Sequence, residues 1–166
     1  MYWLSGFVGF RVRTLIVSVL VVYLLLRQAR LSSEEKKGIW FSGLVFLGLR
    51  VVLEIAARAQ GLWEYTVTDF SLVGVPIDVL VAVAVFFGSG AALIQHYLQG
   101  NKIQRVLSQL GLALLVTWYD FWGARLYGYF RFGSGGYLNK LLVFWFLTLA
   151  SGAFYSWFRR RRNKEV

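Results

Sequence analysis

The sequence alternates between long apolar runs and short polar connectors, and this alternation predicts its architecture. Five runs are long enough to cross a bilayer as helices, because about 20 helical residues span a hydrocarbon core of about 30 Å. We expect these spans at Phe7–Leu26, Ile39–Ala57, Leu72–Leu98, Val106–Leu126 and Leu141–Phe158. The pattern therefore predicts an all-α, polytopic membrane protein, a helical bundle of about five transmembrane helices.

The five runs are expected to form one transmembrane domain over residues 1–158, followed by a basic tail over residues 159–166. The first run has the length of a signal-peptide core. It is followed by Arg27-Gln28-Ala29-Arg30 and not by a small-residue cleavage pattern. We therefore interpret it as a retained first helix.

Composition supports a membrane protein and narrows the classes of site. Hydrophobic types make up 58% of the chain and its mean hydropathy is +0.58, whereas ordinary soluble domains are roughly 45–50% apolar. The net charge of +10 would suggest nucleic acid in a soluble protein, but here the basic residues gather in connectors, so no nucleic-acid partner is expected. The chain has no Cys and a single His, His96, which argues against disulfides, zinc-thiolate sites and multi-histidine metal sites. No metal or cofactor is expected.

The distribution of Lys and Arg predicts the orientation. Eleven of them lie in the first connector, the third connector and the tail, and six lie on the opposite side. Because the more basic side faces the cytoplasm, we expect a multi-pass protein of the cell membrane with its N-terminus outside and its C-terminus inside. The run Arg159–Arg162 is interpreted as a topology determinant that contacts anionic lipid headgroups.

Four ionisable residues fall within the predicted spans: Arg50, Glu54, Asp78 and Asp120. Such residues are costly in lipid, so each is a candidate functional residue. A helical rise of about 1.5 Å per residue places the three carboxylates at similar depths, roughly 20–24 Å from the inner face. We therefore expect Glu54, Asp78 and Asp120 to converge around one cavity in the outer half of the bundle.

Aromatic residues gather near the same level, among them Trp63, Tyr65, Trp122, Tyr127 and Tyr137. A carboxyl group buried away from water favours its neutral form, and such an acid can protonate an alkene. Aromatic faces can then stabilise the resulting carbocation. This combination is suited to isoprenoid chemistry in lipid.

Each of these features also has a simpler interpretation. Arg50 and Glu54 are four residues apart and can neutralise each other on one helix face. The aromatic residues are also typical of an interfacial belt. In the simpler interpretation, Pro76 does no more than kink the third helix. His96 lies about 27 Å along that helix from Asp78 and is interpreted as structural.

Two sets of motifs resemble a known family. The first set is Leu53-Glu54, Gly61-Leu62-Trp63-Glu64-Tyr65-Thr66 and Gly74-Val75-Pro76-Ile77-Asp78. The second is Asp120, Leu126-Tyr127-Gly128-Tyr129, Gly135-Gly136-Tyr137 and Asn139. In order and spacing they resemble carotenoid-biosynthesis membrane proteins: the bisanhydrobacterioruberin hydratases and, more distantly, the heterodimeric-type lycopene cyclase domains. The similar region runs from about Leu53 to Gly152.

The chain also departs from that family. Its members are usually longer, with more helices, and the cyclase domains favour Pro-x-Glu-Glu where this chain has Pro76-Ile77-Asp78. The loop before the last span lacks the second Val-Pro of the family. The resemblance therefore supports a common fold more firmly than a common reaction.

The resemblance implies an enzyme that acts on the end of a long isoprenoid or carotenoid, by proton addition to a carbon–carbon double bond and then capture of water or ring closure. Hydration is favoured, because the downstream match is to the hydratases. Asp120 or Glu54 would be the general acid and Asp78 would position water. The predicted substrate-binding residues are Arg50, Trp63, Tyr65, Pro76, Trp122, Tyr127 and Tyr137, of which Trp63, Tyr65 and Trp122 would shelter the cation.

Two other classes of function remain open from the sequence. A short chain with a basic tail is also typical of a non-catalytic membrane subunit, either in a larger membrane complex or in a homo-oligomer. Aligned carboxylates are used in proton and cation pathways as well. In all three cases membrane lipid is an expected partner.

Overall fold

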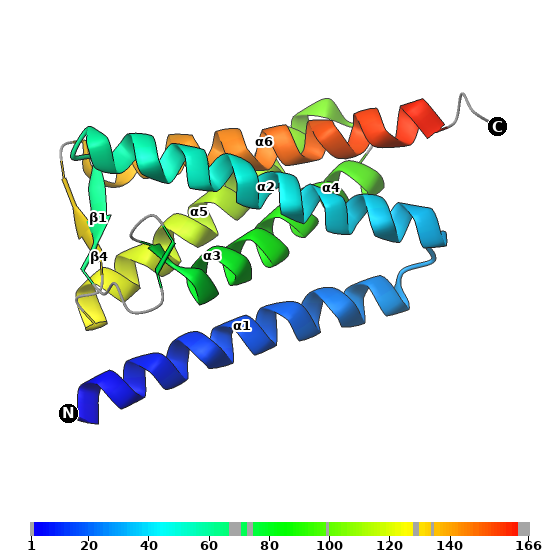
Figure 1. Ribbon diagram of the computed structural model, residues 1–166. Helices are drawn as coiled ribbons and strands as arrows, with labels where there is room; N and C mark the ends of the chain where they lie inside the picture. Colours follow the sequence, from blue (N-terminus) through cyan, green and yellow to red (C-terminus); the bar gives the residue numbers. More distant parts are fainter. Residues whose placement is uncertain are drawn as a thin grey trace.

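The computed structural model describes residues 2–66, 71–72, 75–98, 100–127, 130–133 and 135–162. In this part of the chain, five helical rods pack into a bundle (Figure 1). The helices are α1 (Tyr2–Gln28), α2 (Ser33–Ala59), α3 (Ile77–Val83), the π-helical turn η1 (Ala84–Gly88), α4 (Ser89–Tyr97), α5 (Lys102–Tyr127) and α6 (Gly136–Arg162). Helices α3, η1 and α4 follow one another without a break and form a single rod. The predicted all-α helical bundle is confirmed.

Within the described part of the chain, three stretches of helix are long and apolar enough to cross a membrane. They are Ser33–Ala59, Val79–Tyr97 and Gly136–Arg162. Helix α1 contains a shorter apolar stretch, Leu15–Gln28. These lengths and compositions are compatible with a membrane protein. That α1 and α5 also cross the membrane remains a prediction.

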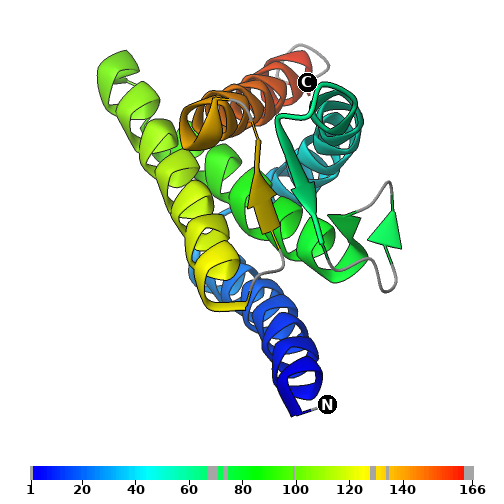
Figure 2. The same ribbon diagram turned by 90° about the vertical axis from the view of Figure 1, so that its left-hand side faces the viewer.

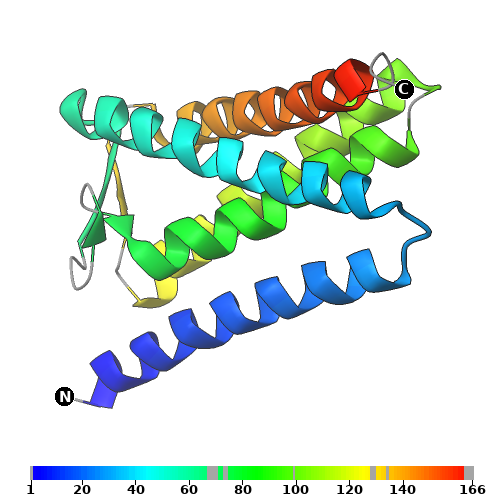
Figure 3. The same ribbon diagram turned by 45° about the vertical axis from the view of Figure 1, so that its right-hand side comes forward.

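The α3–α4 rod forms the centre of the bundle and contacts each of the other four helices. Helix α2 packs against α6 and η1, and α5 packs against α6 and α4. Helix α1 lies along one side, against α3 and η1 (Figures 1 and 3). The start of α1 and the strands β1 and β4 lie at one end of the bundle, and the α1–α2 connection and the end of α6 lie at the other.

The described residues include four short strands, of which β1 and β4 lie in segments that were predicted to be connectors. Strand β1 (Trp63–Tyr65) pairs antiparallel with β4 (Phe130–Phe132), so the segment after α2 is held to the segment before α6. Figure 2 shows this pair across the end of the bundle. A second antiparallel pair joins β2 (Ser71–Leu72) to β3 (Val75–Pro76).

The third predicted span is wrong at its start. The span was expected to begin at Leu72, but Leu72 belongs to β2 and the helix begins at Ile77. Pro76 is the N-cap residue of α3. Proline has no backbone N–H and disfavours helical geometry in the residue before it, so Pro76 begins this helix and does not kink its interior.

Glycine allows α2 and η1 to cross at close range. A Cβ atom added to Gly88 would lie 2.7 Å from Phe46 Cβ and 2.8 Å from Gly43 Cα. A larger residue at Gly88 would therefore push the two helices apart.

Candidate functional site

The buried face of α2 carries two ionisable residues. A stripe of interior positions spaced three or four residues apart includes Ser42, Phe46, Arg50 and Glu54. Arg50 and Glu54 are only 1% and 4% exposed, and Arg50 Nε donates a hydrogen bond to Glu54 Oε1 over 3.3 Å. The four-residue spacing in the sequence therefore forms an ion pair inside the bundle.

Strand β1 covers this ion pair at one end of the bundle. Side chains alternate between the two faces of a strand, so Trp63 and Tyr65 are buried while Glu64 is exposed. Trp63 Nε1 donates to Glu54 Oε2 over 2.6 Å, and Arg50 Nη2 donates to the Tyr65 hydroxyl over 3.0 Å. Both members of the pair are thus attached to β1.

A second buried ion pair joins α5 to α6. Asp120 and Lys140 are both 0% exposed, and Lys140 Nζ lies 2.7 Å from Asp120 Oδ2. The same ammonium donates to the Tyr65 hydroxyl over 3.5 Å. Because Tyr65 also accepts from Arg50, its hydroxyl links the two pairs. We refer to Arg50, Glu54, Tyr65, Asp120 and Lys140 as the buried charge cluster.

Aromatic rings surround the lysine ammonium. Lys140 Nζ lies 5.1 Å from the centroid of the Tyr65 ring and 5.4 Å from that of Trp63. The rings of Phe144 and Phe132 lie at 5.7 and 6.0 Å. Ring faces attract cations, most strongly where water is excluded. Trp63 and Tyr65, predicted to shelter a substrate cation, therefore contact the cation of this lysine.

The charges of the cluster balance, with two cations against two carboxylates. Glu54 and Asp120, the two acids that the sequence hypothesis considers as proton donors, are therefore each held by a cation of the protein itself. Among the residues that the structure describes, no three His, Asp or Glu side chains gather closely enough to hold a metal ion.

Two of the predicted aromatic residues lie outside the cluster. Trp122 is 38% exposed and packs edge-on against Trp118 and Phe121. Tyr137 is half-exposed, and its ring centroid lies 3.9 Å from that of Phe132. Tyr137 thus packs against Phe132, the ring that in turn lies 6.0 Å from Lys140 Nζ.

The remaining predicted residues lie along α3 and at the end of α5. Pro76 is buried at the start of α3. Asp78 and Tyr127 belong to α3 and α5, and their side chains fall outside what the structure describes. Arg50 Nη1 donates to the Val79 carbonyl oxygen over 3.4 Å. The buried charge cluster therefore holds the first turn of α3, the turn that carries Asp78.

Lys140 is a site residue that was not predicted from the sequence. It lies one residue before an apolar run and therefore resembles the charges of the preceding connector. The interior stripe of α6 includes Lys140, Phe144, Leu147, Ser151 and Tyr155, with spacings of three and four residues. If the helical periodicity of the apolar run is continued for one turn toward the N-terminus, it places Lys140 on the buried face.

An apolar groove opens beside the cluster, between α1, the α3–η1 segment and α5. Its volume is about 300 Å³, and its lining includes Ser18, Val79, Val83, Phe86, Leu115 and Trp118. Val79 is the residue whose carbonyl accepts from Arg50. A cavity of this size, with a mostly apolar lining, is typical of a site for a small molecule.

No protein-family model, curated protein or solved structure matches this chain. The resemblance to carotenoid-biosynthesis membrane proteins therefore remains a prediction from the motifs. Two features of the described residues limit the chemistry that the chain can perform. They are the charge-balanced buried cluster and the apolar groove that adjoins it at Val79.

Proposed function

We propose that this chain is a multi-pass membrane protein that binds the end of a long isoprenoid, such as a carotenoid, and adds a proton to its terminal double bond. The observation that carries the proposal is the position of the apolar groove, which adjoins the buried charge cluster at Val79. An isoprenoid dissolved in the bilayer would enter the groove sideways between helices. It would reach ionisable groups without passing through water.

The length of the groove favours an end group over a whole chain. Along the α3–η1 segment its lining runs from Val79 to Phe87, a distance of about 12 Å at a rise of about 1.5 Å per residue. A carotenoid is considerably longer than this. The end of the chain would occupy the groove, and the rest would lie in the surrounding lipid.

Asp78 is the proton donor in this proposal. Glu54 and Asp120 are each paired with a buried cation, and neither of them lines the groove. Asp78 lies in the first turn of α3 and directly precedes Val79 in the chain, and Val79 lines the groove. The cluster fixes this turn through the hydrogen bond from Arg50 to the Val79 carbonyl.

The reaction consists of a proton transfer followed by capture of the cation. The carboxyl proton of Asp78 would add to the terminal double bond, and the second alkene carbon would become a tertiary carbocation. The faces of Phe86 and Trp118, which line the groove, would stabilise this cation. Water would then bond to the cation and return one proton to the Asp78 carboxylate, so that the net change is addition of water. Attack by a neighbouring double bond, with loss of a proton, would give a ring instead.

Amide variants in a host that supplies linear carotenoids test this assignment. Asn at position 78 keeps the size of the side chain but carries no acidic proton. Asp78→Asn should therefore lower conversion roughly 10²–10⁴-fold, with unchanged protein in the membrane. Glu64→Gln is the matched control, since it removes an exposed carboxylate on β1. Conversion that survives in Asp78→Asn would refute the assignment of the acid, and a wild type that converts none of the supplied carotenoids would refute the function.

The second candidate function is a non-catalytic subunit of a larger membrane complex. It is favoured by the mutual pairing of the buried charges, which connects α2, α5, α6 and β1 without requiring a reaction. Co-purification with a large membrane complex, together with no change in any supplied isoprenoid, would support this alternative.

A further inference from the structure

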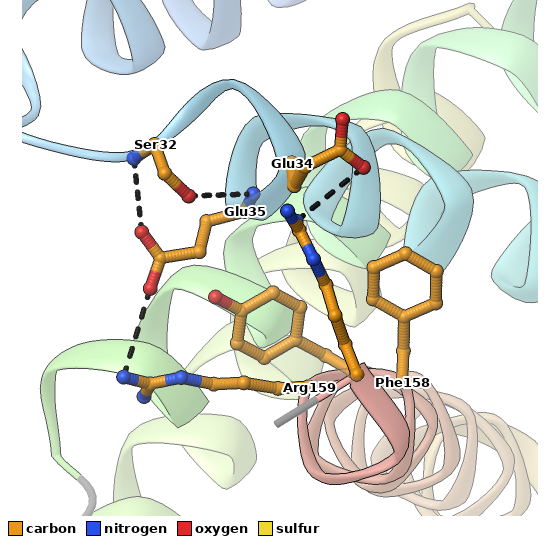
Figure 4. A pocket seen from close by; sticks show the side chains of 7 residues that line it. Ser32, Glu34, Glu35, Phe158 and Arg159 are labelled. Atoms are coloured by element: carbon orange, nitrogen blue, oxygen red, sulfur yellow. Dashed lines mark hydrogen bonds and ion pairs between the residues drawn. The ribbon is translucent and has the colours of Figure 1, made fainter. Parts of the chain in front are cut away.

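A second pocket lies at the end of the bundle opposite β1 and β4, away from the proposed isoprenoid site. It forms where the start of α2 meets the end of α6, and its volume is about 560 Å³ (Figure 4). Its walls carry both signs of charge. Glu34 and Glu35 line it from α2, and Arg159 and Arg162 line it from α6. Such a pocket is complementary to a ligand that is itself zwitterionic.

The ion pairs across this pocket are long. Arg159 Nη2 lies 3.6 Å from Glu35 Oε1, and Arg162 Nη1 lies 3.4 Å from Glu34 Oε2. Charge-assisted bonds of this kind are usually about 2.7–2.9 Å long. A carboxylate offers about four acceptor sites and a guanidinium about five donors. These pairs therefore leave room for hydrogen bonds to a ligand on both walls.

Local contacts hold the acidic wall in place. The Ser32 N–H donates to Glu35 Oε2 over 2.9 Å, and the Glu35 N–H donates to Ser32 Oγ over 3.2 Å. This capping box at the start of α2 is visible in Figure 4. Lys37 Nζ donates to Glu34 Oε1 over 2.7 Å. Both carboxylates are thus oriented before any ligand arrives.

Aromatic side chains of α6 complete the lining. Phe158 and Tyr155 both face the pocket, and the Tyr155 hydroxyl lies 2.9 Å from His96 Nδ1. Ring faces stabilise an ammonium group that lies over them. Because Tyr155 is only 1% exposed, the pocket offers a cation two carboxylates and the ring of Phe158, and it offers an anion two guanidinium groups.

We propose that this pocket binds the phosphoethanolamine headgroup of a membrane phospholipid. The ammonium would lie between Glu34 and Glu35, and the phosphate would lie at Arg159 and Arg162. A primary ammonium donates three hydrogen bonds, whereas the quaternary ammonium of choline donates none. A purely anionic headgroup would be repelled by the two carboxylates. The proposal rests on the membrane placement in the proposed function but does not depend on the isoprenoid reaction.

Lipid binding to the purified full-length chain in detergent tests the site. Phosphatidylethanolamine, phosphatidylcholine and phosphatidylglycerol with identical acyl chains would be titrated, with binding followed by native mass spectrometry. We expect phosphatidylethanolamine to bind about tenfold more tightly than the other two, which corresponds to about 1.4 kcal/mol. Equal binding of the three lipids, or a preference for phosphatidylglycerol, would overturn the proposal. Soluble glycerophosphoethanolamine that binds as tightly as the lipid would overturn the lipid as its source.

Matched arginine variants separate the pocket from the charge of the tail. Arg159→Gln should abolish the preference for phosphatidylethanolamine. Arg160→Gln removes the same charge from an exposed neighbour that does not line the pocket, and it should keep the preference. Glu34→Gln should make the ethanolamine and choline lipids bind equally. Loss of the preference in Arg160→Gln as well would show that only the net charge of the tail matters and would refute the site. Circular dichroism of each variant establishes that the helices are intact.

Discussion

Replacing Asp120 with asparagine would leave the Lys140 ammonium without its carboxylate partner in the interior of the bundle. Both side chains are 0% exposed, and the ion pair is 2.7 Å long. The Tyr65 hydroxyl at 3.5 Å is a weaker partner for the ammonium than a carboxylate. The variant should therefore be strongly destabilised.

The magnitude follows from the burial of the pair. Removing one partner of a buried ion pair typically costs about 3–5 kcal/mol, which is a factor of about 10²–10⁴ in the folding equilibrium. The double variant Asp120→Asn with Lys140→Met removes both charges and should recover most of this loss. The Glu64–Arg131 pair provides the control. Its side chains are 51% and 74% exposed, so Glu64→Gln should cost at most about 1 kcal/mol.

These free energies are measured by unfolding the wild type, Asp120→Asn, the double variant and Glu64→Gln in mixed detergent micelles. Tryptophan fluorescence and circular dichroism follow the unfolding. A loss below about 1 kcal/mol in Asp120→Asn would refute the reasoning, because the lysine would then have another adequate partner or access to water. A double variant no more stable than Asp120→Asn would show that the cost comes from packing and not from the unpaired charge.

Two further predictions concern the bundle and its placement. Gly88→Ala should lower the free energy of unfolding by about 1–3 kcal/mol, because the added Cβ would lie 2.7 Å from Phe46 Cβ. The control Gly48→Ala adds a Cβ that meets nothing within 4 Å, so it should be neutral or stabilising by about 0.5–1 kcal/mol. Equal unfolding midpoints for the two variants would contradict the close crossing of α2 and η1. On the distribution of basic residues, a reporter fused after Val166 should be scored cytoplasmic and one inserted between α5 and α6 should be scored external. The opposite pattern would invert the orientation.

The sequence predicted the helices because each apolar run is long enough to define a helix locally. It misplaced the start of the third rod because Leu72 is apolar but belongs to a strand pair that ends at Pro76. The pairing of β1 with β4 could not be predicted from either segment. It joins residues more than 60 positions apart, and neither three-residue strand carries enough alternation to indicate its partner.

The ionisable residues of the site were only partly predictable. The cost of burying charge indicated Arg50, Glu54 and Asp120 from the sequence alone, and the structure brings all three into one cluster. The ion pair of Asp120 depends on Lys140, which lies just outside an apolar run and therefore was not predicted to be an interior residue. Without this lysine, Asp120 appeared to be an isolated acid. Its counterion depends on the long-range contact between α5 and α6.

Isotope incorporation into a linear carotenoid tests the central claim most directly. The purified chain would be incubated with the carotenoid in phospholipid vesicles made up in D₂O enriched in H₂¹⁸O, and the products analysed by mass spectrometry. Protonation followed by capture of water predicts a product with one deuterium on carbon next to a carbon that bears an ¹⁸O hydroxyl. Ring closure would give the carbon-bound deuterium without ¹⁸O. Products that carry neither label, or unchanged carotenoid, would contradict proton addition to the double bond.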